Sequence, residues 1–221
     1  TFPALRRVPG YVTPHGHYRS AYPNEIDRDA ARGRLGLSRD ETMMLHLGRI
    51  RPYKHVPHLV GTFSQTDLRN TRLFVVGNPV SDDLRSQIEQ AAAEDLRVRL
   101  RLEFIPDEDM QVYFNAADLV VLPFRDIVHS GSALLSLSFN CPVVVPTHGA
   151  MGELREQVGA DWVHTYEGEF TSGVLTAALE WLRRTDRSSP APLNDLRWDT
   201  IARRTLEAYQ SILRATEPIH E

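Results

Sequence analysis

The stretches "LVVLP" (residues 119–123) and "PVVVP" (142–146) are short runs of uninterrupted apolar residues. Strands buried on both faces have this composition, because helices cover both sides of a parallel sheet. Similar β-branched or apolar runs recur along the chain, separated by longer amphipathic stretches. The sequence therefore predicts strands at residues 43–47, 73–76, 98–104, 119–122, 143–145 and 161–164.

The stretches between these runs have helical patterns. In residues 82–94, Leu84 and Ile88 share a face with Ala91 or Ala92, and acidic residues stand in the first turn. Further helices are predicted at residues 56–63, 109–116, 133–139, 153–158, 171–184 and, after a loop rich in Pro and Ser, 198–213. This alternation predicts an α/β fold with a single Rossmann-like, doubly wound parallel sheet.

Composition excludes several classes of protein. The 221 residues carry a formal net charge of −4, which argues against broad electrostatic capture of nucleic acid. Cys141 is the only cysteine, so the chain forms no internal disulfide and fits a reducing compartment. No apolar run approaches the roughly 20 residues that a membrane span needs. We expect a cytoplasmic protein with no transmembrane segment.

Lys54 is the only lysine among the 25 basic residues, and it stands in "LGRIRPYKH" (47–55), just after the first predicted strand. Ligands of open parallel sheets bind beyond the carboxyl ends of the strands, so the residues that follow each strand are candidates for a site. Gly48 and Arg49 follow the same strand, and Gly77 and Asn78 follow the next. An arginine and a lysine together suit a diphosphate, one as a planar fork and the other as a compact charge.

A helix is predicted to begin near Ser130-Gly131-Ser132, after the run at 119–123. Such a start offers unpaired backbone N–H groups, hydroxyls and the positive end of a helix dipole to an anion. Taken singly, a Gly-Arg turn with a solvated charge or an ordinary N-cap would explain each motif. Their joint occurrence at one edge of the sheet predicts an anion site.

Several common sites are absent from the sequence. No G-x-G-x-x-G follows a predicted strand, which argues against a nicotinamide or flavin site, and no P-loop motif or G-x-S-x-G elbow occurs. The nine histidines show no metal-ligand spacing.

An ordered series of motifs resembles one family from about Val12 to Leu213. The series is "VTPHG" (12–16), "GRIRPYK" (48–54), "FVVGNP" (74–79), "FIPDEDMQVYFNAADLVVLP" (104–123), "CPVVVPTHGAMGEL" (141–154) and "WDTIARRTLEAYQSIL" (198–213). It resembles the C-terminal, donor-binding half of retaining GT-B glycosyltransferases of the family 4 type, the group 1 glycosyl transferases.

The resemblance implies how the chain is divided. Residues 1–20 would connect to a preceding domain, residues 21–195 would form the nucleotide-sugar domain, and residues 196–221 would form a C-terminal helix and tail. The helix would pack back across the junction between the halves of the GT-B fold. The N-terminal acceptor domain would lie outside this chain, which alone would be inactive.

The resemblance also assigns site residues. Arg49 and Lys54 would be the catalytic phosphate clamp, with no metal or other cofactor. The remaining donor-binding positions would be Gly48, Gly77, Asn78, Phe104, Ile105, Asp126, Ser130, Gly131, Ser132 and Leu135. The family's two glutamates fall here on Ile127 and Leu135, which cannot hydrogen-bond a sugar. Asp126 is a candidate substitute for the first, although a surface ion pair with Arg125 explains it equally well.

By this resemblance, the intact protein transfers a hexosyl unit from a GDP- or UDP-linked sugar to an acceptor with retention of configuration. A bacterial role in making cell-surface polysaccharide or glycoconjugate would follow, with peripheral membrane contact through the missing half. Two alternatives stay open: a non-catalytic module that binds nucleotides or phosphosugars, and a sugar-nucleotide epimerase with a GT-B fold.

Overall fold

The computed structural model describes residues 11–125 and 130–216. The described chain forms two compact units. One is Tyr18–Pro192, and the other combines the described parts of Thr1–His17 and Leu193–Glu221. None of the described helices is both long and apolar enough to cross a membrane.

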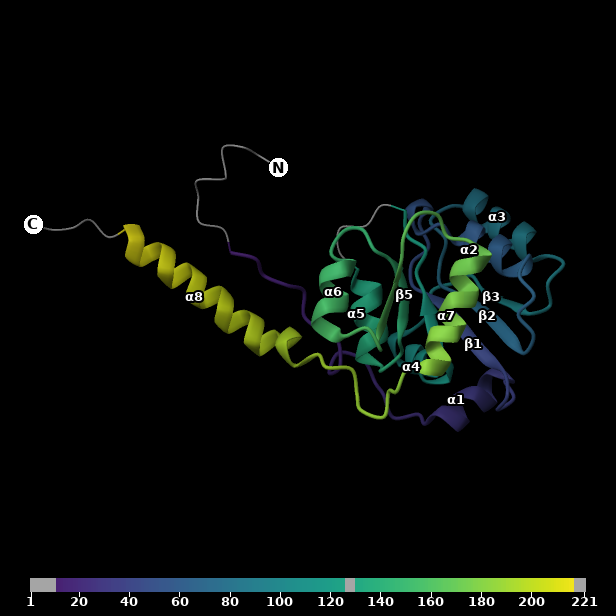
Figure 1. Ribbon diagram of the computed structural model, residues 1–221, viewed down its shortest axis with the longest axis horizontal. Coiled ribbons are helices and arrows are strands. Elements are labelled where there is room, and N and C mark those ends of the chain that lie inside the picture. The colour runs from purple at the N-terminus through teal and green to yellow at the C-terminus, as the bar shows by residue number, and fades with distance from the viewer. Residues whose placement is uncertain (1–10, 126–129, 217–221) are drawn as a thin grey trace, which may run out of the picture. The chain divides into compact units, whose positions relative to one another are not determined.

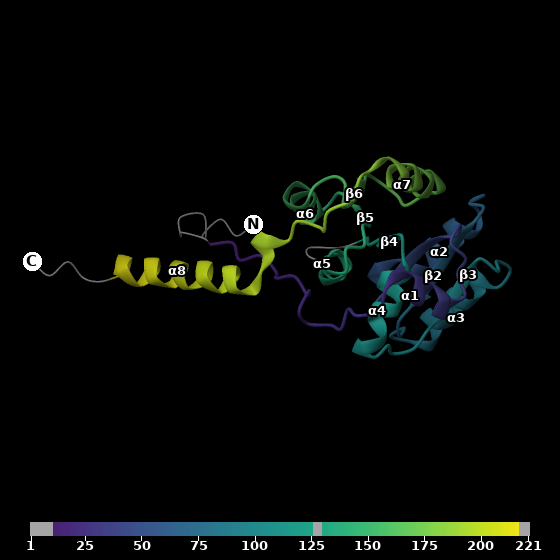
Figure 2. The same ribbon diagram turned by 90° about the horizontal axis from the view of Figure 1, so that it is seen from below.

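The larger unit is built on one open parallel sheet (Figures 1 and 2). Its strands are β1 (Thr42–Leu47), β2 (Thr71–Val76), β3 (Val98–Arg101), β4 (Leu119–Val121), β5 (Val143–Pro146) and β6 (Val163–Tyr166). They lie in the order β3-β2-β1-β4-β5-β6, and every pairing is parallel. This is the doubly wound order, in which the direction of winding reverses between β1 and β4. The predicted fold class is confirmed.

The strand at residues 98–104 is shorter than predicted. It lies at the edge of the sheet and pairs only with β2, and its last pairing joins Arg101 to Val76 at the end of β2. Beyond that point no partner strand remains, so the chain leaves the sheet and Phe104 is exposed. The sequence pattern therefore overestimated the length of this strand, because pairing with a neighbouring strand, rather than composition, sets where the strand ends.

The predicted helices are all present, with ends shifted by a few residues. They are α2 (Val56–Ser64), α3 (Asp82–Ala92), α4 (Asp107–Ala116), α5 (Gly131–Ser138), α6 (Met151–Val158), α7 (Ser172–Arg184) and α8 (Trp198–Thr216). Short 3₁₀ turns occupy Pro52–Lys54 and Asn194–Leu196. Helix α2 contacts both α3 and α7. A core of buried side chains joins these three helices to the sheet, including Leu59, Ile88 and Leu175.

Helix α1 (Arg28–Leu35) was not predicted from the sequence. Only Ala31 and Arg32 are buried in it, so it carries no apolar stripe that a periodicity search would detect. Its ends do carry a signal. Asp27 caps the first turn by accepting from the Ala30 N–H, and Gly36 ends the helix in the left-handed conformation.

The buried Arg32 fastens α1 to the sheet. Its guanidinium donates to the carbonyl oxygens of Ala116, Ser38 and Glu41 at 3.0, 2.6 and 2.5 Å. It also lies 3.3 Å from a carboxylate oxygen of Asp118. The same oxygen accepts from the N–H of Met43, the second residue of β1. Because both terminal nitrogens of the guanidinium meet two acceptors each, the buried charge is compensated.

The smaller unit joins α8 to the segment at residues 11–17. The His17 N–H donates to the Leu196 carbonyl at 2.8 Å, and the His15 ring meets Trp198 edge-on at 5.3 Å. Near the far end, the Tyr11 hydroxyl donates to Ser211 at 2.8 Å. The packing of this helix across a domain junction stays a prediction.

We predict that Arg32→Leu lowers the free energy of unfolding by about 3 kcal/mol, because it leaves three buried carbonyls and Asp118 without their donor. Urea denaturation followed by circular dichroism measures this. Arg39→Leu is the control, since Arg39 is exposed and pairs only with the exposed Asp29. We expect that control to change stability by less than about 0.5 kcal/mol. Equal losses in the two variants would contradict the role given to Arg32.

Candidate functional site

The reversal of the sheet between β1 and β4 places two loops side by side at its carboxyl edge. The loop after β1 leads into α2, and the loop after β4 leads into α5. In doubly wound sheets this reversal opens a crevice, because the two connections run to opposite faces. The predicted anion-binding residue Lys54 ends the 3₁₀ turn in the first connection, and Ser132 is the second residue of α5, at the end of the other.

Two glycines let the loops after β1 and β2 touch through their backbones. Gly48 and Gly77 have φ angles of +130° and +136°, which side chains other than hydrogen rarely allow. A Cβ on Gly77 would lie 2.1 Å from the Gly48 carbonyl oxygen. A Cβ on Gly48 would lie 3.3 Å from the Lys54 ammonium nitrogen and 3.7 Å from the Ser132 hydroxyl. The Lys54 ammonium and the Ser132 hydroxyl thus both lie against Gly48, which forms the floor of the site.

Lys54 is buried, with 6% of its surface exposed. Its Nζ lies 3.4 Å from Ser132 Oγ and 5.5 Å from the centre of the Phe124 ring. Burial first, and then the charge of Arg51, lower the pKa of Lys54 to about 8. Among the described residues, Ser132 is the only one with a hydrogen bond to this ammonium, which therefore lacks the acceptors that usually compensate a buried charge; an anion would supply them.

The start of α5 faces the same place. Ser130 is the N-cap, and its hydroxyl accepts from the Ala133 N–H at 3.0 Å. The first N–H groups of a helix, here those of Gly131 and Ser132, have no partner within the helix. Together with the dipole they form a patch of positive potential beside Lys54.

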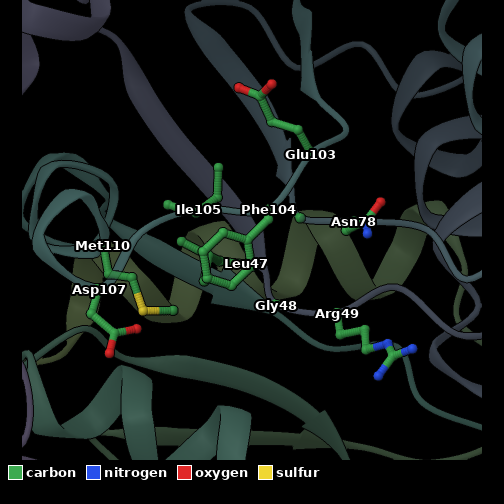
Figure 3. A pocket seen from close by; sticks show the side chains of 10 residues that line it. Leu47, Gly48, Arg49, Asn78, Glu103, Phe104, Ile105, Asp107 and Met110 are labelled. Atoms are coloured by element: carbon green, nitrogen blue, oxygen red, sulfur yellow. The ribbon is translucent and has the colours of Figure 1, made fainter.

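A cavity of about 370 Å³ continues from Gly48 toward the edge of the sheet. It is lined by Leu47, Gly48, Arg49, Gly77, Asn78, Glu103, Phe104, Ile105, Asp107 and Met110. Figure 3 shows the Phe104 ring between Met110 and Asp107 on one side and Arg49 and Asn78 on the other. The carboxylate of Glu103 points away from the ring, and it pairs with Arg101 at 2.7 Å.

The structure brings most of the predicted site residues together in two groups that share Gly48. Lys54 and Ser132 meet above it, beside Ser130 and Gly131 at the start of α5. The second group lines the cavity and consists of Arg49, Gly77, Asn78, Phe104 and Ile105. Leu135 is half-buried further along α5 and does not line this cavity. Asp126 and Ile127 lie outside the described residues.

The sequence interpretation missed four residues that line the cavity: Leu47, Glu103, Asp107 and Met110. Asp107 is the first residue of α4. It looked like one of several acids that favour a helix start, and nothing in its sequence position separated it from Glu108 or Asp109. Among the described residues, no group of three or more His, Cys, Asp or Glu is arranged to hold a metal ion.

Comparison with known proteins gives the family. The sequence model described as "Glycosyl transferases group 1" matches residues 41–179, more than half of the chain. The chain belongs to the glycosyl transferases group 1 family. It is 32% identical over 199 residues to the GDP-mannose:glycolipid 4-beta-D-mannosyltransferase of Xanthomonas campestris, a match that covers 90% of this chain and 54% of that protein. This family member therefore spans about half the length of the curated relatives it matches.

Solved structures show the same fold. Sucrose-phosphate synthase from Thermosynechococcus elongatus superposes with a TM-score of 0.74 at 23% identity, over 96% of this chain and 56% of that one. The C-terminal domain of a glycosyl transferase group 1 family protein from Francisella tularensis matches 90% of this chain and 96% of its own, with a TM-score of 0.56 and 15% identity. At these identities the likeness concerns the fold, and it places this group 1 chain with C-terminal GT-B domains.

We predict that Lys54→Met stabilises the protein by about 1–3 kcal/mol at pH 7, because it removes a buried ammonium and keeps the apolar stem. The pKa of Lys54 falls from 10.5 to about 8 on folding, so at pH 7 the full cost of the buried charge is present. It is relieved as the pH rises from about 8 toward 10.5, and the gain in the variant shrinks there.

Urea denaturation at pH 7 and pH 10 measures this difference. Arg39→Met removes an exposed cation far from Lys54 in sequence, which pairs only with the exposed Asp29, and serves as the control, with no gain expected. A Lys54→Met variant less stable than the wild type at pH 7 would show that Lys54 is a structural residue.

Proposed function

We propose that this chain is the donor-binding half of a glycosyltransferase, and that it holds the diphosphate of a nucleoside-diphosphate sugar above Gly48. The observation that carries the proposal is the buried, under-compensated ammonium of Lys54, which lies beside Ser132 and the start of α5. A diphosphate would supply the missing acceptors and bond to the free N–H groups of α5. Arg49, on the other side of Gly48, would reach the same group from the cavity.

The arrangement suits the departure of a nucleoside diphosphate. When the bond from the anomeric carbon to phosphate breaks, negative charge develops on the phosphate oxygens. Cations and N–H groups fixed in place stabilise this charge more in the transition state than in the ground state. Lys54 and Arg49 would act in this way, and in the family resemblance they replace a metal ion. We include independence of metal in the proposal, and activity in excess EDTA tests it.

The cavity beside Arg49 would hold the nucleobase, and its chemistry favours guanine. Phe104 offers an aromatic face, and Ile105 and Met110 give an apolar wall. The carboxylate of Asp107 can accept from both the N1–H and the exocyclic amine of guanine, a pair of donors that uracil lacks. The named substrate of the relative from Xanthomonas, GDP-mannose, supports the same base.

The acceptor would bind to a part of the protein outside this chain. The relative from Xanthomonas is named for transfer to a glycolipid, and this chain matches about half of its length. We propose that a preceding domain supplies a comparable acceptor site and any contact with a membrane surface. The bacterial origin, the role in polysaccharide or glycoconjugate synthesis and the cytoplasmic location stay predictions.

The anomeric outcome is a separate part of the proposal. The resemblance to family 4 enzymes implies retention, whereas the relative is named for a β linkage. Proton NMR of the product distinguishes the two. A β-mannoside formed from an α-linked donor would replace retention with inversion and leave the diphosphate site unchanged.

We predict that GDP raises the melting temperature of the chain more than UDP or ADP does. A ligand at 100 times its Kd adds about 2.7 kcal/mol of stability.

In the full-length protein, Lys54→Ala or Arg49→Ala should lower turnover by about 100-fold, the order seen when one oxyanion donor is lost. Arg39→Ala, which removes an exposed cation elsewhere, should leave turnover within twofold.

The outcomes separate the alternatives. No binding of any nucleoside diphosphate would reject the proposal. Binding without turnover in the full-length protein would favour the non-catalytic module, and free sugar released without acceptor would favour an epimerase.

We predict that Asp107→Asn weakens GDP binding about tenfold and leaves UDP binding unchanged, because the amide removes one acceptor and the charge from the guanine edge. Isothermal titration calorimetry measures both affinities. Glu103→Gln is the matched control, since that residue lines the same cavity but its carboxylate points away from the Phe104 ring and pairs with Arg101. Equal effects on GDP and UDP would contradict the assignment of Asp107 to the base.

A further inference from the structure

His46, near the end of β1, is a fully buried histidine with one ring nitrogen unpaired. Its Nδ1 lies 3.0 Å from the carbonyl oxygen of Val121 in β4, whereas its Nε2 has no hydrogen-bond partner among the described residues. A carbonyl only accepts, so Nδ1 carries the proton and Nε2 presents a lone pair. Buried polar atoms are nearly always satisfied, and an unpaired one calls for a reason.

The His46 ring and the Lys54 ammonium both lie beside the Phe124 ring. The His46 ring meets the Phe124 ring edge-on at 6.4 Å between centres, and the Lys54 ammonium lies 5.5 Å from the centre of that same ring. Burial first, and then the charge of Lys54, lower the pKa of His46 to about 3. His46 is therefore neutral near neutral pH, and its Nε2 can serve a nearby cation only as an acceptor.

The other groups near Lys54 do not supply a full set of acceptors for its ammonium. Arg51 on its own loop is a second cation, Ser132 on α5 gives one long contact of 3.4 Å, and Phe124 after β4 offers only its ring. A lysine ammonium has three N–H donors. The buried ammonium lacks an acceptor, the buried imidazole lacks a donor, and both groups lie beside the same Phe124 ring.

We propose that His46 is a positioning residue for Lys54, its Nε2 accepting from the ammonium through one water molecule. The contact would keep the lysine charged in its buried place and directed at Ser132 and the start of α5. This inference rests on the proposed function, because it assigns a role to His46 through the lysine that would bind the diphosphate. His46 itself would not touch the donor.

A pH signature follows from this role. Above about pH 8 the free protein must take up a proton at Lys54 before the ammonium can bind a diphosphate, so affinity falls as the pH rises. Loss of the acceptor would make the ammonium less stable and move this fall to lower pH. A purely structural role for His46 would instead weaken binding by the same factor at every pH.

The titration of Lys54 can be observed directly, because it is the only lysine of the chain. We would label the chain with ¹⁵N-lysine and follow the single Nζ signal by NMR between pH 6 and pH 11. The variants are His46→Met, which fills the space without an acceptor, and His46→Gln, whose amide oxygen can stand near the position of Nε2. We expect titration near pH 8 in the wild type, within about 0.5 unit of it in His46→Gln, and at least about 1 unit lower in His46→Met.

Calorimetric titration of GDP into the same proteins tests the consequence for binding. At pH 8, His46→Met should bind about tenfold more weakly than the wild type, and at pH 6.5 within about twofold. In a Lys54→Met background, adding His46→Met should have no further effect. An unchanged lysine titration in His46→Met, a loss equal at all pH values, or a loss that persists without Lys54 would overturn the inference.

Two further results keep the test decisive. If His46→Met does not fold, the ¹⁵N shift of His46 Nε2 in the wild type must change as Lys54 titrates, and a constant shift would overturn the contact. If GDP, UDP and ADP all fail to bind the wild type, the proposed function is lost, whereas the lysine titration still decides whether His46 supports Lys54.

Discussion

The burial of one positive charge at the reversal point of the sheet is the constraint on which the site depends. Lys54 comes from the loop after β1, and it reaches Ser132 at the start of α5, 78 positions further along the chain. Only the doubly wound order, with β1 beside β4, brings these two loops together. The glycine floor then sets how close they come, since any side chain on Gly77 would collide with the Gly48 carbonyl.

Two buried cations in this protein, Arg32 and Lys54, differ in how many acceptors surround them. This difference distinguishes a cation that holds the fold together from one suited to bind a ligand. The guanidinium of Arg32 meets three carbonyls and a carboxylate, so its desolvation is compensated and it fixes α1 in place. The ammonium of Lys54 has one long contact and an aromatic ring. A folded protein that keeps such a charge under-compensated gives up stability, and this loss is reasonable where a ligand completes the site.

In the proposed site, phosphate recognition would rely on backbone and cations more than on acidic side chains. The position corresponding to the family's second glutamate is Leu135, half-buried in α5. The Ser-Gly-Ser helix start offers N–H groups that do not depend on that glutamate. The diphosphate and the base would then lie on rigid parts of the fold, along the ends of β1 and β2 and the starts of α4 and α5.

The sequence by itself determined the strands and helices whose own pattern of apolar residues shows which side chains are buried. Uninterrupted apolar runs gave the strands and amphipathic periods gave the helices, because both patterns record which side chains leave water. The motif order gave the family, and the residues after each strand gave most of the candidate site. Helix α1 was not predicted, because a buried alanine and a buried arginine make no apolar stripe. The end of β3 was not predicted correctly, because pairing with β2 decides where that strand ends.

Only the tertiary structure decided which of these residues meet. Asp107 looked like any acid in a first turn until the fold placed it in the cavity beside Phe104. His46 looked like an ordinary residue of a buried strand until the fold placed its ring beside Phe124, which follows β4 and also lies beside the Lys54 ammonium. Sequence patterns record how a side chain is buried but not what it is buried against, and contacts between distant loops are set by the strand order of the sheet.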